Sequence, residues 1–293
     1  MRAAWLIVAA GLLAAAAPPQ KIAPGEIVAA APASAWKAIP AEDLLVLDLK
    51  SGGRVIIQLA PAFAPVHVAN VRALARAGHW ADATIYRVQD NYVAQWGNND
   101  SEKPWPTGVV PKPPAEYSRP LKGLDITPLG NADPYAPAAG FADGWPVAYS
   151  PRRGWATLAH CYGSVGVGRG LSPDTGTGGE LYAVIGHGPR QLDRNIAVVG
   201  RVVEGIERLS TLPRGTEALG FYKDKAQYVP IAAVRMASDL PAGERPSFEF
   251  MDTRSASFRD YLRVRRHRFD DFYIQPALGA DLCNVQVPVR RKG

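Results

Sequence analysis

The feature that most constrains the fold is a series of short apolar segments of strand length, separated by turn-forming residues. The first two, residues 44–49 (LLVLDL) and 54–59 (RVIIQL), flank a Ser-Gly-Gly turn and are predicted to form a hairpin. Two segments have helical spacing instead, residues 64–77 and 204–212. Many short strands with few helices favour a β-barrel or sandwich over a parallel α/β sheet. The remaining strands are predicted at residues 84–88, 92–96, 155–159, 181–185, 196–203 and 230–236.

The N-terminus has the pattern of an export signal. Arg2 precedes an apolar run over residues 3–17, and Ala15 and Ala17 offer a cleavage site before Pro18. The run is shorter than the roughly 20 apolar residues that span a membrane. We therefore predict a signal peptide over residues 1–17 and a periplasmic or secreted protein without stable membrane insertion after cleavage. An uncleaved anchor is the alternative.

Composition and charge narrow the class of protein. The chain is 47% hydrophobic and 20% charged, which is ordinary for a soluble globular protein, and its formal net charge is +6. The basic run at residues 263–268 is surrounded by aspartates, so we interpret it as a solvated helix face and predict no nucleic-acid partner. Neither the five histidines nor the two cysteines have metal-ligand spacing, so no metal site is predicted.

The two cysteines, Cys161 and Cys283, lie far apart in the sequence. An oxidising compartment permits a disulfide between them, whereas two buried free thiols that act as small apolar side chains fit equally well. Both interpretations stay open at this stage.

Three stretches lie outside the strand pattern. Residues 18–42 are rich in alanine and proline and are predicted to be a flexible lead. Residues 104–153 contain eleven prolines and little alternation, which is typical of a long insert without regular structure. Residues 241–293 are predicted to be a C-terminal extension packed on the barrel, with an amphipathic helix near residues 258–269 and an extended segment at 285–289.

Residues 85–97 (IYRVQDNYVAQWG) carry a more specific pattern. They resemble the central signature of the cyclophilin family, F-H-R-V-x-x-x-F-M-x-Q-G-G. Three other blocks resemble cyclophilin motifs in the same order, at residues 64–74 (APVHVANVRAL), 154–159 (GWATLA) and 192–205 (LDRNIAVVGRVVEG). The likeness spans residues 43–240.

The resemblance implies a mainly β fold: a closed eight-stranded antiparallel β-barrel with two capping helices. It also implies a cofactor-free peptidyl-prolyl cis-trans isomerase. The family's catalytic arginine falls on Arg87 and its peptide-binding glutamine on Gln95. The residues that match the family's apolar proline pocket are Tyr92, Val93, Tyr182 and Leu192.

The chemistry makes modest demands on such a site. Amide resonance sets a barrier of roughly 18–20 kcal/mol to rotation about the X-Pro bond. No covalent bond breaks, so the site needs neither a nucleophile nor a metal and must favour the twisted amide over both planar forms. In that state the prolyl nitrogen accepts a hydrogen bond, and a guanidinium such as that of Arg87 is a suitable fixed donor. The expected partners are proline-containing segments of exported proteins.

Several positions depart from the family pattern. Tyr86 stands where a histidine is common, Glu180 replaces the second glutamine, and His160 replaces the asparagine of the M-A-N segment. The rim tryptophan and histidine fall on Gln191 and Ile196. We expect Glu180 and His160 to contact the substrate, and the glycine-rich residues 163–179 to form a loop beside the groove. Reduced activity follows from these changes, and the alternative function is a catalytically weak peptide-binding or chaperone module.

Overall fold

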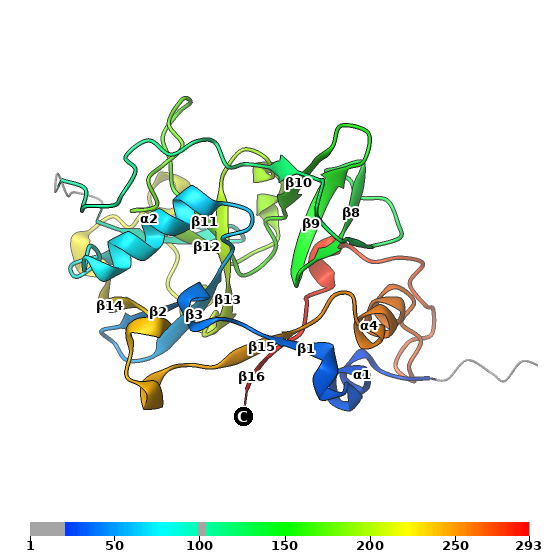
Figure 1. Cartoon of the computed structure of the whole chain (residues 1–293). Helices are drawn as coiled ribbons and strands as arrows, with labels where there is room; N and C mark the ends of the chain where they lie inside the picture. The colour runs from blue at the N-terminus through cyan, green and yellow to red at the C-terminus, as the bar shows by residue number, and fades with distance from the viewer. Residues whose placement is uncertain (1–20, 99–103, 293) are drawn as a thin grey trace, which may run out of the picture.

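The computed structural model describes residues 21–98 and 104–292, so the predicted signal peptide lies outside the described residues. Eight antiparallel strands close into a barrel in the order β11-β12-β5-β4-β14-β2-β3-β13. Figure 1 shows this barrel beside the sheet that contains β8, β9 and β10. This closed barrel confirms the predicted fold class. Its strands are β2 (Leu44–Leu49), β3 (Arg54–Leu59), β4 (Thr84–Val88), β5 (Val93–Gly97), β11 (Ser164–Val167), β12 (Leu181–Val184), β13 (Val198–Glu204) and β14 (Val229–Met236).

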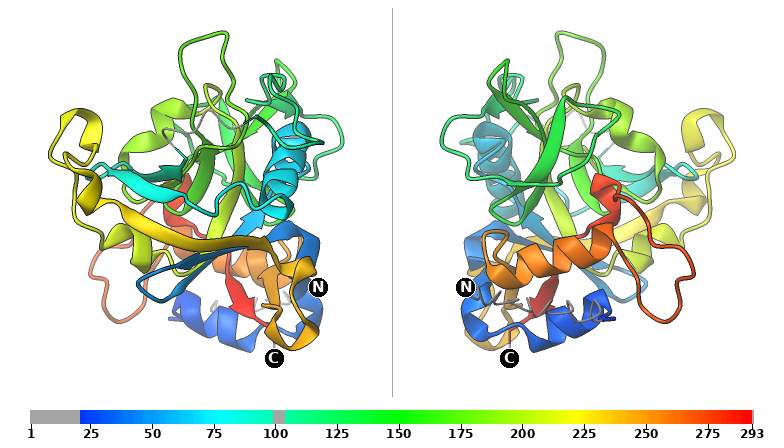
Figure 2. Two further views of the ribbon diagram at one scale, coloured as in Figure 1. Left: turned by 90° about the vertical axis from the view of Figure 1, so that its left-hand side faces the viewer. Right: turned by 90° about the vertical axis from the view of Figure 1, so that its right-hand side faces the viewer.

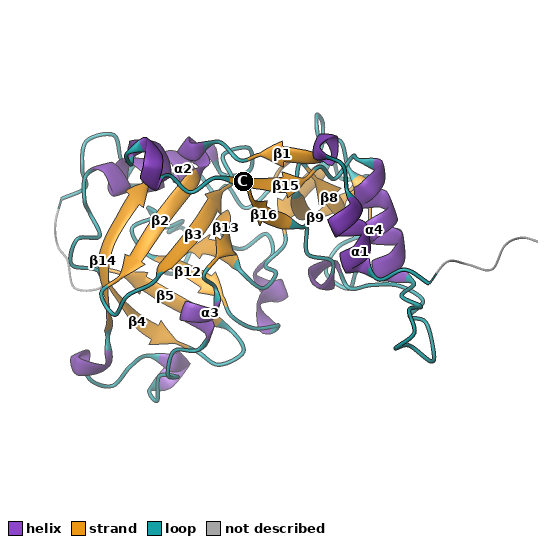
Figure 3. Cartoon of the chain, turned by 90° about the horizontal axis from the view of Figure 1, so that it is seen from below, coloured by secondary structure: helices purple, strands orange, loops and turns teal. Residues whose placement is uncertain are grey.

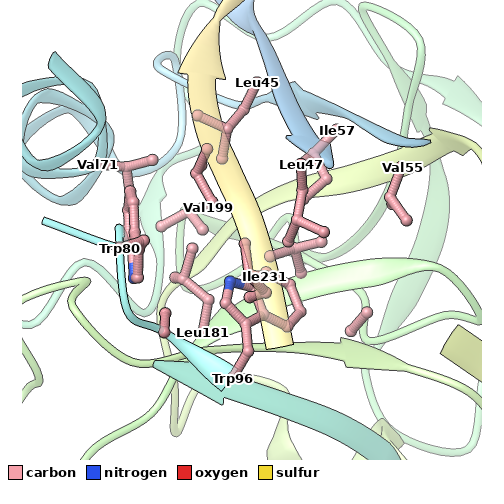
Figure 4. Packing of buried hydrophobic residues seen from close by; sticks show 14 of the residues in the cluster. Leu45, Leu47, Val55, Ile57, Val71, Trp80, Trp96, Leu181, Val199 and Ile231 are labelled. Carbon is pink, nitrogen blue, oxygen red and sulfur yellow. The ribbon is translucent and has the colours of Figure 1, made fainter. Parts of the chain in front are cut away.

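Alternate residues of these strands fill the barrel interior. Leu45 and Leu47 on β2 point inward and meet Trp96 on β5 in one buried cluster (Figure 4). The helices α2 (Pro65–Arg76) and α3 (Glu207–Ser210) contribute Val71 and Leu209 to the same cluster. Both helices therefore cap the barrel core, as predicted.

The outer face of β2 and β3 is also apolar, which explains why LLVLDL shows no clean alternation. Leu44, Val46 and Ile56 point away from the barrel and are fully buried in a second core. A strand buried on both faces reads as a continuous apolar run. A second layer must therefore cover this side of the barrel.

The chain termini form part of that layer. A three-stranded sheet has the order β1-β15-β16, and α1 lies alongside α4 (Figures 2 and 3). The prediction of a flexible lead over residues 18–42 is wrong for its described part, because Trp36 and Ile39 are buried in the second core. The elements concerned are α1 (Pro24–Ala30), β1 (Trp36–Ala38), β15 (Phe248–Met251), α4 (Ala256–Arg266) and β16 (Val289–Arg291).

The proline-rich insert is also more regular than predicted. Four of its segments join β10 in a five-stranded sheet of order β6-β10-β9-β8-β7. Prolines are tolerated there because they lie in the turns, in the short outer strands, or at a single position of β9. The strands are β6 (Arg119–Pro120), β7 (Thr127–Pro128), β8 (Ala138–Ala142), β9 (Trp145–Ser150) and β10 (Trp155–Leu158).

Two strand predictions change as a result. The WATLA segment at residues 155–159 is β10 of the second sheet and not a barrel strand. Residues 164–167, predicted to belong to a glycine-rich loop, instead form the barrel strand β11. A four-residue strand that contains a glycine carries too little pattern to be recognised without its partners β12 and β13.

Polar contacts hold the insert to the barrel. The Glu116 carboxylate accepts hydrogen bonds from the backbone N–H groups of Val66 and His67 in the first turn of α2, each at 2.9 Å. A negative charge at a helix N-terminus is stabilising. Short 3-10 turns complete the fold at Ala33–Ala35, Ala41–Asp43, Gly188–Leu192, Ala218–Gly220, Lys225–Gln227, Ala237–Asp239, Ala242–Glu244 and Leu282–Asn284.

A disulfide connects the barrel side of the molecule to the C-terminal extension. Cys161 and Cys283 are bonded, with their Cα atoms 4.9 Å apart and a sequence separation of 122 residues. Of the two interpretations that the sequence left open, the structure contains the disulfide.

Candidate active site

The hairpin of β4 and β5 brings the two predicted catalytic residues together. Arg87 and Gln95 are register partners, and an irregularity between Ile85 and Arg87 interrupts the ladder. Successive strand residues normally point to opposite faces. At this irregularity, however, the side chains of both Tyr86 and Arg87 reach Gln95. The structure therefore supplies the shared face that the sequence alone could not establish.

Arg87 is held by three hydrogen bonds. Its Nη1 donates to Oε1 of Gln95 at 2.9 Å, its Nη2 donates to Oε1 of Gln89 at 2.7 Å, and its Nε donates to the carbonyl of Leu219 at 2.7 Å. A guanidinium has five N–H groups, so two remain to donate to a substrate. Burial lowers the pKa of Arg87 from its usual value, yet a guanidinium stays charged at neutral pH.

Aromatic rings frame the same guanidinium. Its central carbon lies 5.4 Å from the ring centroid of Phe221 and 5.9 Å from that of Tyr92. The ring of Tyr86 is stacked with Phe221 at a centroid distance of 6.0 Å. These contacts fix the plane of the arginine side chain and limit its access to water.

The predicted proline-pocket residues form one apolar cluster beside this arginine. Val93, Tyr182 and Val184 are buried, and Tyr92, Leu192 and Ile196 pack against them. The antiparallel pairing of β5 and β12 sets this arrangement, with Val184 opposite Val93 and Tyr182 opposite Gln95. All four pocket residues named from the sequence lie in the cluster.

His160 lies behind this pocket with a fully buried side chain. Its Nε2 is 3.0 Å from the hydroxyl of Tyr182, and its Nδ1 is 2.9 Å from a carboxylate oxygen of Asp193. Asp193 in turn accepts from Nε of Arg190 at 2.6 Å, and Arg190 donates to Asp133 of the insert. In this conformation His160 supports the pocket wall and has no surface to offer a peptide.

Glu180 is also turned toward the protein. Its carboxylate accepts from the hydroxyl of Tyr86 at 2.6 Å, and the Tyr86 oxygen accepts from Nε2 of Gln95 at 2.5 Å. Burial is the largest influence on Glu180 and raises the pKa of its carboxyl group to about 7. The carboxylate that was predicted to contact the substrate is thus bonded to Tyr86, which in turn is bonded to Gln95.

Sequence reasoning missed three contributors to the site. Gln89 and Leu219 hold the guanidinium of Arg87, and Phe221 packs on it. Gln89 lies within the signature and could have been noticed as a polar residue two positions after the arginine. Leu219 and Phe221 come from a loop more than 120 residues downstream, where no local pattern marks them.

Within residues 21–98 and 104–292, no group of three or more His, Cys, Asp or Glu side chains comes together in a way that could hold a metal ion. None of the helices in those ranges has the length and apolar character needed to cross a membrane.

Comparison with known proteins agrees with this geometry. A family model described as "Cyclophilin type peptidyl-prolyl cis-trans isomerase/CLD" matches residues 45–236, more than half of the chain. Curated relatives from Brucella suis and Brucella abortus are each named a probable peptidyl-prolyl cis-trans isomerase. Each is 25% identical over 177 residues, which cover 60% of this chain and 74% of the relative.

A solved structure extends the likeness beyond the barrel. The crystal structure of a cyclophilin from Hirschia baltica matches with a TM-score of 0.69 and 23% sequence identity, over 87% of this chain and 93% of that one. At this identity the match shows a common fold. Together with the family match over residues 45–236, it establishes that the chain belongs to the cyclophilin-type peptidyl-prolyl cis-trans isomerase family.

Proposed function

We propose that the protein is exported and catalyses the cis–trans isomerisation of X-Pro bonds in other exported proteins as they fold. One observation carries the proposal: a charged guanidinium with two N–H groups to spare lies beside a cluster of apolar and aromatic side chains. The substrate proline would occupy the cluster around Val93 and Tyr182, and Gln95 would hold the substrate backbone. Arg87 would donate a hydrogen bond to the prolyl nitrogen as the amide twists.

The location rests on two further features. The first 17 residues have the pattern of a signal peptide. Cys161 and Cys283 form a disulfide, and structural disulfides persist in oxidising compartments such as the periplasm. Export is tested by fractionating cells and sequencing the N-terminus of the mature protein. We expect a periplasmic or secreted product that begins at Pro18, whereas a full-length cytoplasmic product would contradict the export proposal.

The activity is tested by measuring isomerisation of short Ala-Xaa-Pro-Phe peptides by the wild type and by Arg87→Ala. Loss of a preorganised donor typically costs about 10²–10³ in rate. The matched control is Arg214→Ala, because Arg214 is a partly exposed arginine whose ion pair is with Asp90. We expect the control to retain the wild-type rate. A wild type without measurable rate, with peptide binding retained, would instead favour a peptide-binding or chaperone module.

A further inference from the structure

Behind the catalytic arginine lies a continuous chain of four polar side chains. Nη1 of Arg87 is 2.9 Å from Oε1 of Gln95, Nε2 of Gln95 is 2.5 Å from the Tyr86 hydroxyl, and that hydroxyl is 2.6 Å from Glu180. Tyr86 is only 2% exposed, so little water competes for these bonds. The chain joins β4, β5 and the first residues before β12.

The chemistry of the two ends determines the direction of every bond. A guanidinium only donates, so the amide atom of Gln95 that faces Arg87 must be its oxygen. The amide nitrogen then faces Tyr86 and donates to the phenol oxygen. The phenol proton is left to point at Glu180, and an ionised carboxylate accepts it. Burial raises the pKa of Tyr86, so this phenol keeps its proton throughout the physiological range.

We propose that Glu180 and Tyr86 are positioning residues for prolyl isomerisation: the ionised Glu180 carboxylate, acting through Tyr86, holds the amide of Gln95 in the orientation that aligns Arg87. This inference rests on the proposed function and concerns residues that would regulate the same site. The polar atoms of both residues face Gln95 and each other, so we assign neither residue a direct contact with the substrate. Tyr86 and Glu180, which both depart from the family pattern, thus interact directly with each other.

The surrounding backbone leaves room for this arrangement. A Cβ atom on Gly97 would overlap the carboxylate of Glu180. A Cβ atom on Gly168 would lie 3.0 Å from Cβ of Glu180 and 3.3 Å from Nε2 of Gln95. Two glycines, one at the end of β5 and one directly after β11, therefore permit the close approach of the glutamate to the glutamine.

Because Glu180 can gain or lose a proton, its effect on the orientation of Gln95 depends on pH. Burial raises the pKa of its carboxyl group to about 7, while hydrogen bonds from Tyr86 and the backbone of Asn98 oppose this shift. Below pH 7 the neutral acid is a weaker acceptor for the phenol, and above pH 7 the carboxylate is a strong one. Ionisable groups around Glu180 include Tyr86 on β4, Arg87 across Gln95, Tyr182 on β12 opposite Gln95, and His79 beside Gly179.

The test is the pH dependence of kcat/KM between pH 5.5 and 8.5. For the wild type we expect a rise of about fivefold with a midpoint near pH 7, since bonds to charged acceptors are stronger than bonds to neutral ones. We expect Glu180→Gln and Tyr86→Phe to abolish this step, because each removes the link between the carboxyl proton and Gln95. A purely structural role would lower the rate without removing the step.

The control substitution is Glu207→Gln, which makes the same chemical change at a side chain that is 67% exposed. We expect it to keep the wild-type profile. If the step near pH 7 survives in Glu180→Gln, another titrating group causes it and the inference is wrong.

A second readout does not need activity. The side-chain amide signals of Gln95 can be followed by ¹⁵N NMR and assigned by their loss in Gln95→Ala. They are expected to shift with a midpoint near pH 7 in the wild type and to stay constant in Glu180→Gln. Signals that do not titrate in the wild type would overturn the inference. An inactive wild type whose Gln95 signals titrate would refute the proposed function alone.

Discussion

Replacing Asp133 with alanine is expected to lower the free energy of unfolding by about 3–5 kcal/mol. Asp133 belongs to the proline-rich insert and accepts from Nη1 and Nη2 of Arg190 at 3.1 and 3.0 Å. The side chains of Asp133 and Arg190 are 1% and 3% exposed, so water cannot replace the lost partner. Each charge-assisted bond contributes about 1.5–3 kcal/mol. The substitution removes both bonds from Arg190, together with those that Oδ1 accepts from the backbone N–H groups of Tyr135 and Ala136, while Arg190 keeps its bond to Asp193.

The matched control is Asp90→Ala. Asp90 also pairs with an arginine, Arg214, at 3.0 Å, but the two side chains are 77% and 38% exposed. An exposed ion pair contributes about 0–1 kcal/mol, so this change is expected to leave stability almost unaltered. The two variants differ mainly in burial.

The assay is urea unfolding followed by tryptophan fluorescence, with the free energy of unfolding obtained by linear extrapolation. A loss below about 1 kcal/mol for Asp133→Ala, no larger than for Asp90→Ala, would refute the reasoning. Such a result would mean that the buried Asp133–Arg190 pair contributes as little to the free energy of unfolding as the solvated Asp90–Arg214 pair. The cluster also reaches the pocket, because Asp193 binds both Arg190 and His160.

Two further predictions concern stability. The pKa of Glu180 is raised on folding from an ordinary 4.5 to about 7, so the folded state binds the proton more tightly and wild-type stability falls as pH rises through this window. Above pH 7 the buried charge lowers the free energy of unfolding by on the order of 3 kcal/mol, and Glu180→Gln removes this loss. In urea unfolding, the stability of the variant relative to the wild type should therefore be greater at pH 8 than at pH 5. The same difference at both pH values would contradict this prediction. Reduction of the disulfide, or replacement of both Cys161 and Cys283 by serine, is expected to lower the free energy of unfolding by about 4–5 kcal/mol in the chain-entropy model, because the cysteines are 122 positions apart in the sequence. Alkylation with and without reductant checks the bond itself, and free reaction of both cysteines without reductant would rule it out.

The barrel could be predicted in large part because its strands carry local information. Seven of the eight predicted strands are barrel strands, among them the hairpin of β2 and β3. The exception is WATL at residues 155–158, which has strand composition but pairs with β9 and β6. Strand propensity indicates that a segment pairs and says nothing of which sheet it joins. The missing barrel strand, β11, has only four residues.

The termini and the insert could not be predicted in the same way. Residues 36–38 carry little pattern of their own and form a strand because β15, more than 200 residues away, provides its hydrogen-bonding partners. The apolar outer face of β2 was visible in the sequence as a lack of alternation. It indicates that something covers the barrel there, without indicating what.

By itself, the sequence determined the family and the barrel, and it led to the prediction of Arg87 and Gln95 as the two central residues, because both sit in a continuous signature on one hairpin. Only the tertiary structure decided how the departures act: Glu180 and Tyr86 form a chain with Gln95, and His160 supports Tyr182 from behind. The physical reason is the distance along the sequence over which each kind of interaction acts. Hydrophobic alternation and turn residues act over a few positions and remain legible in one dimension. The hydrogen bond between Tyr86 and Glu180 instead joins residues 94 positions apart, and it exists only once β12 has paired with β5 in the barrel.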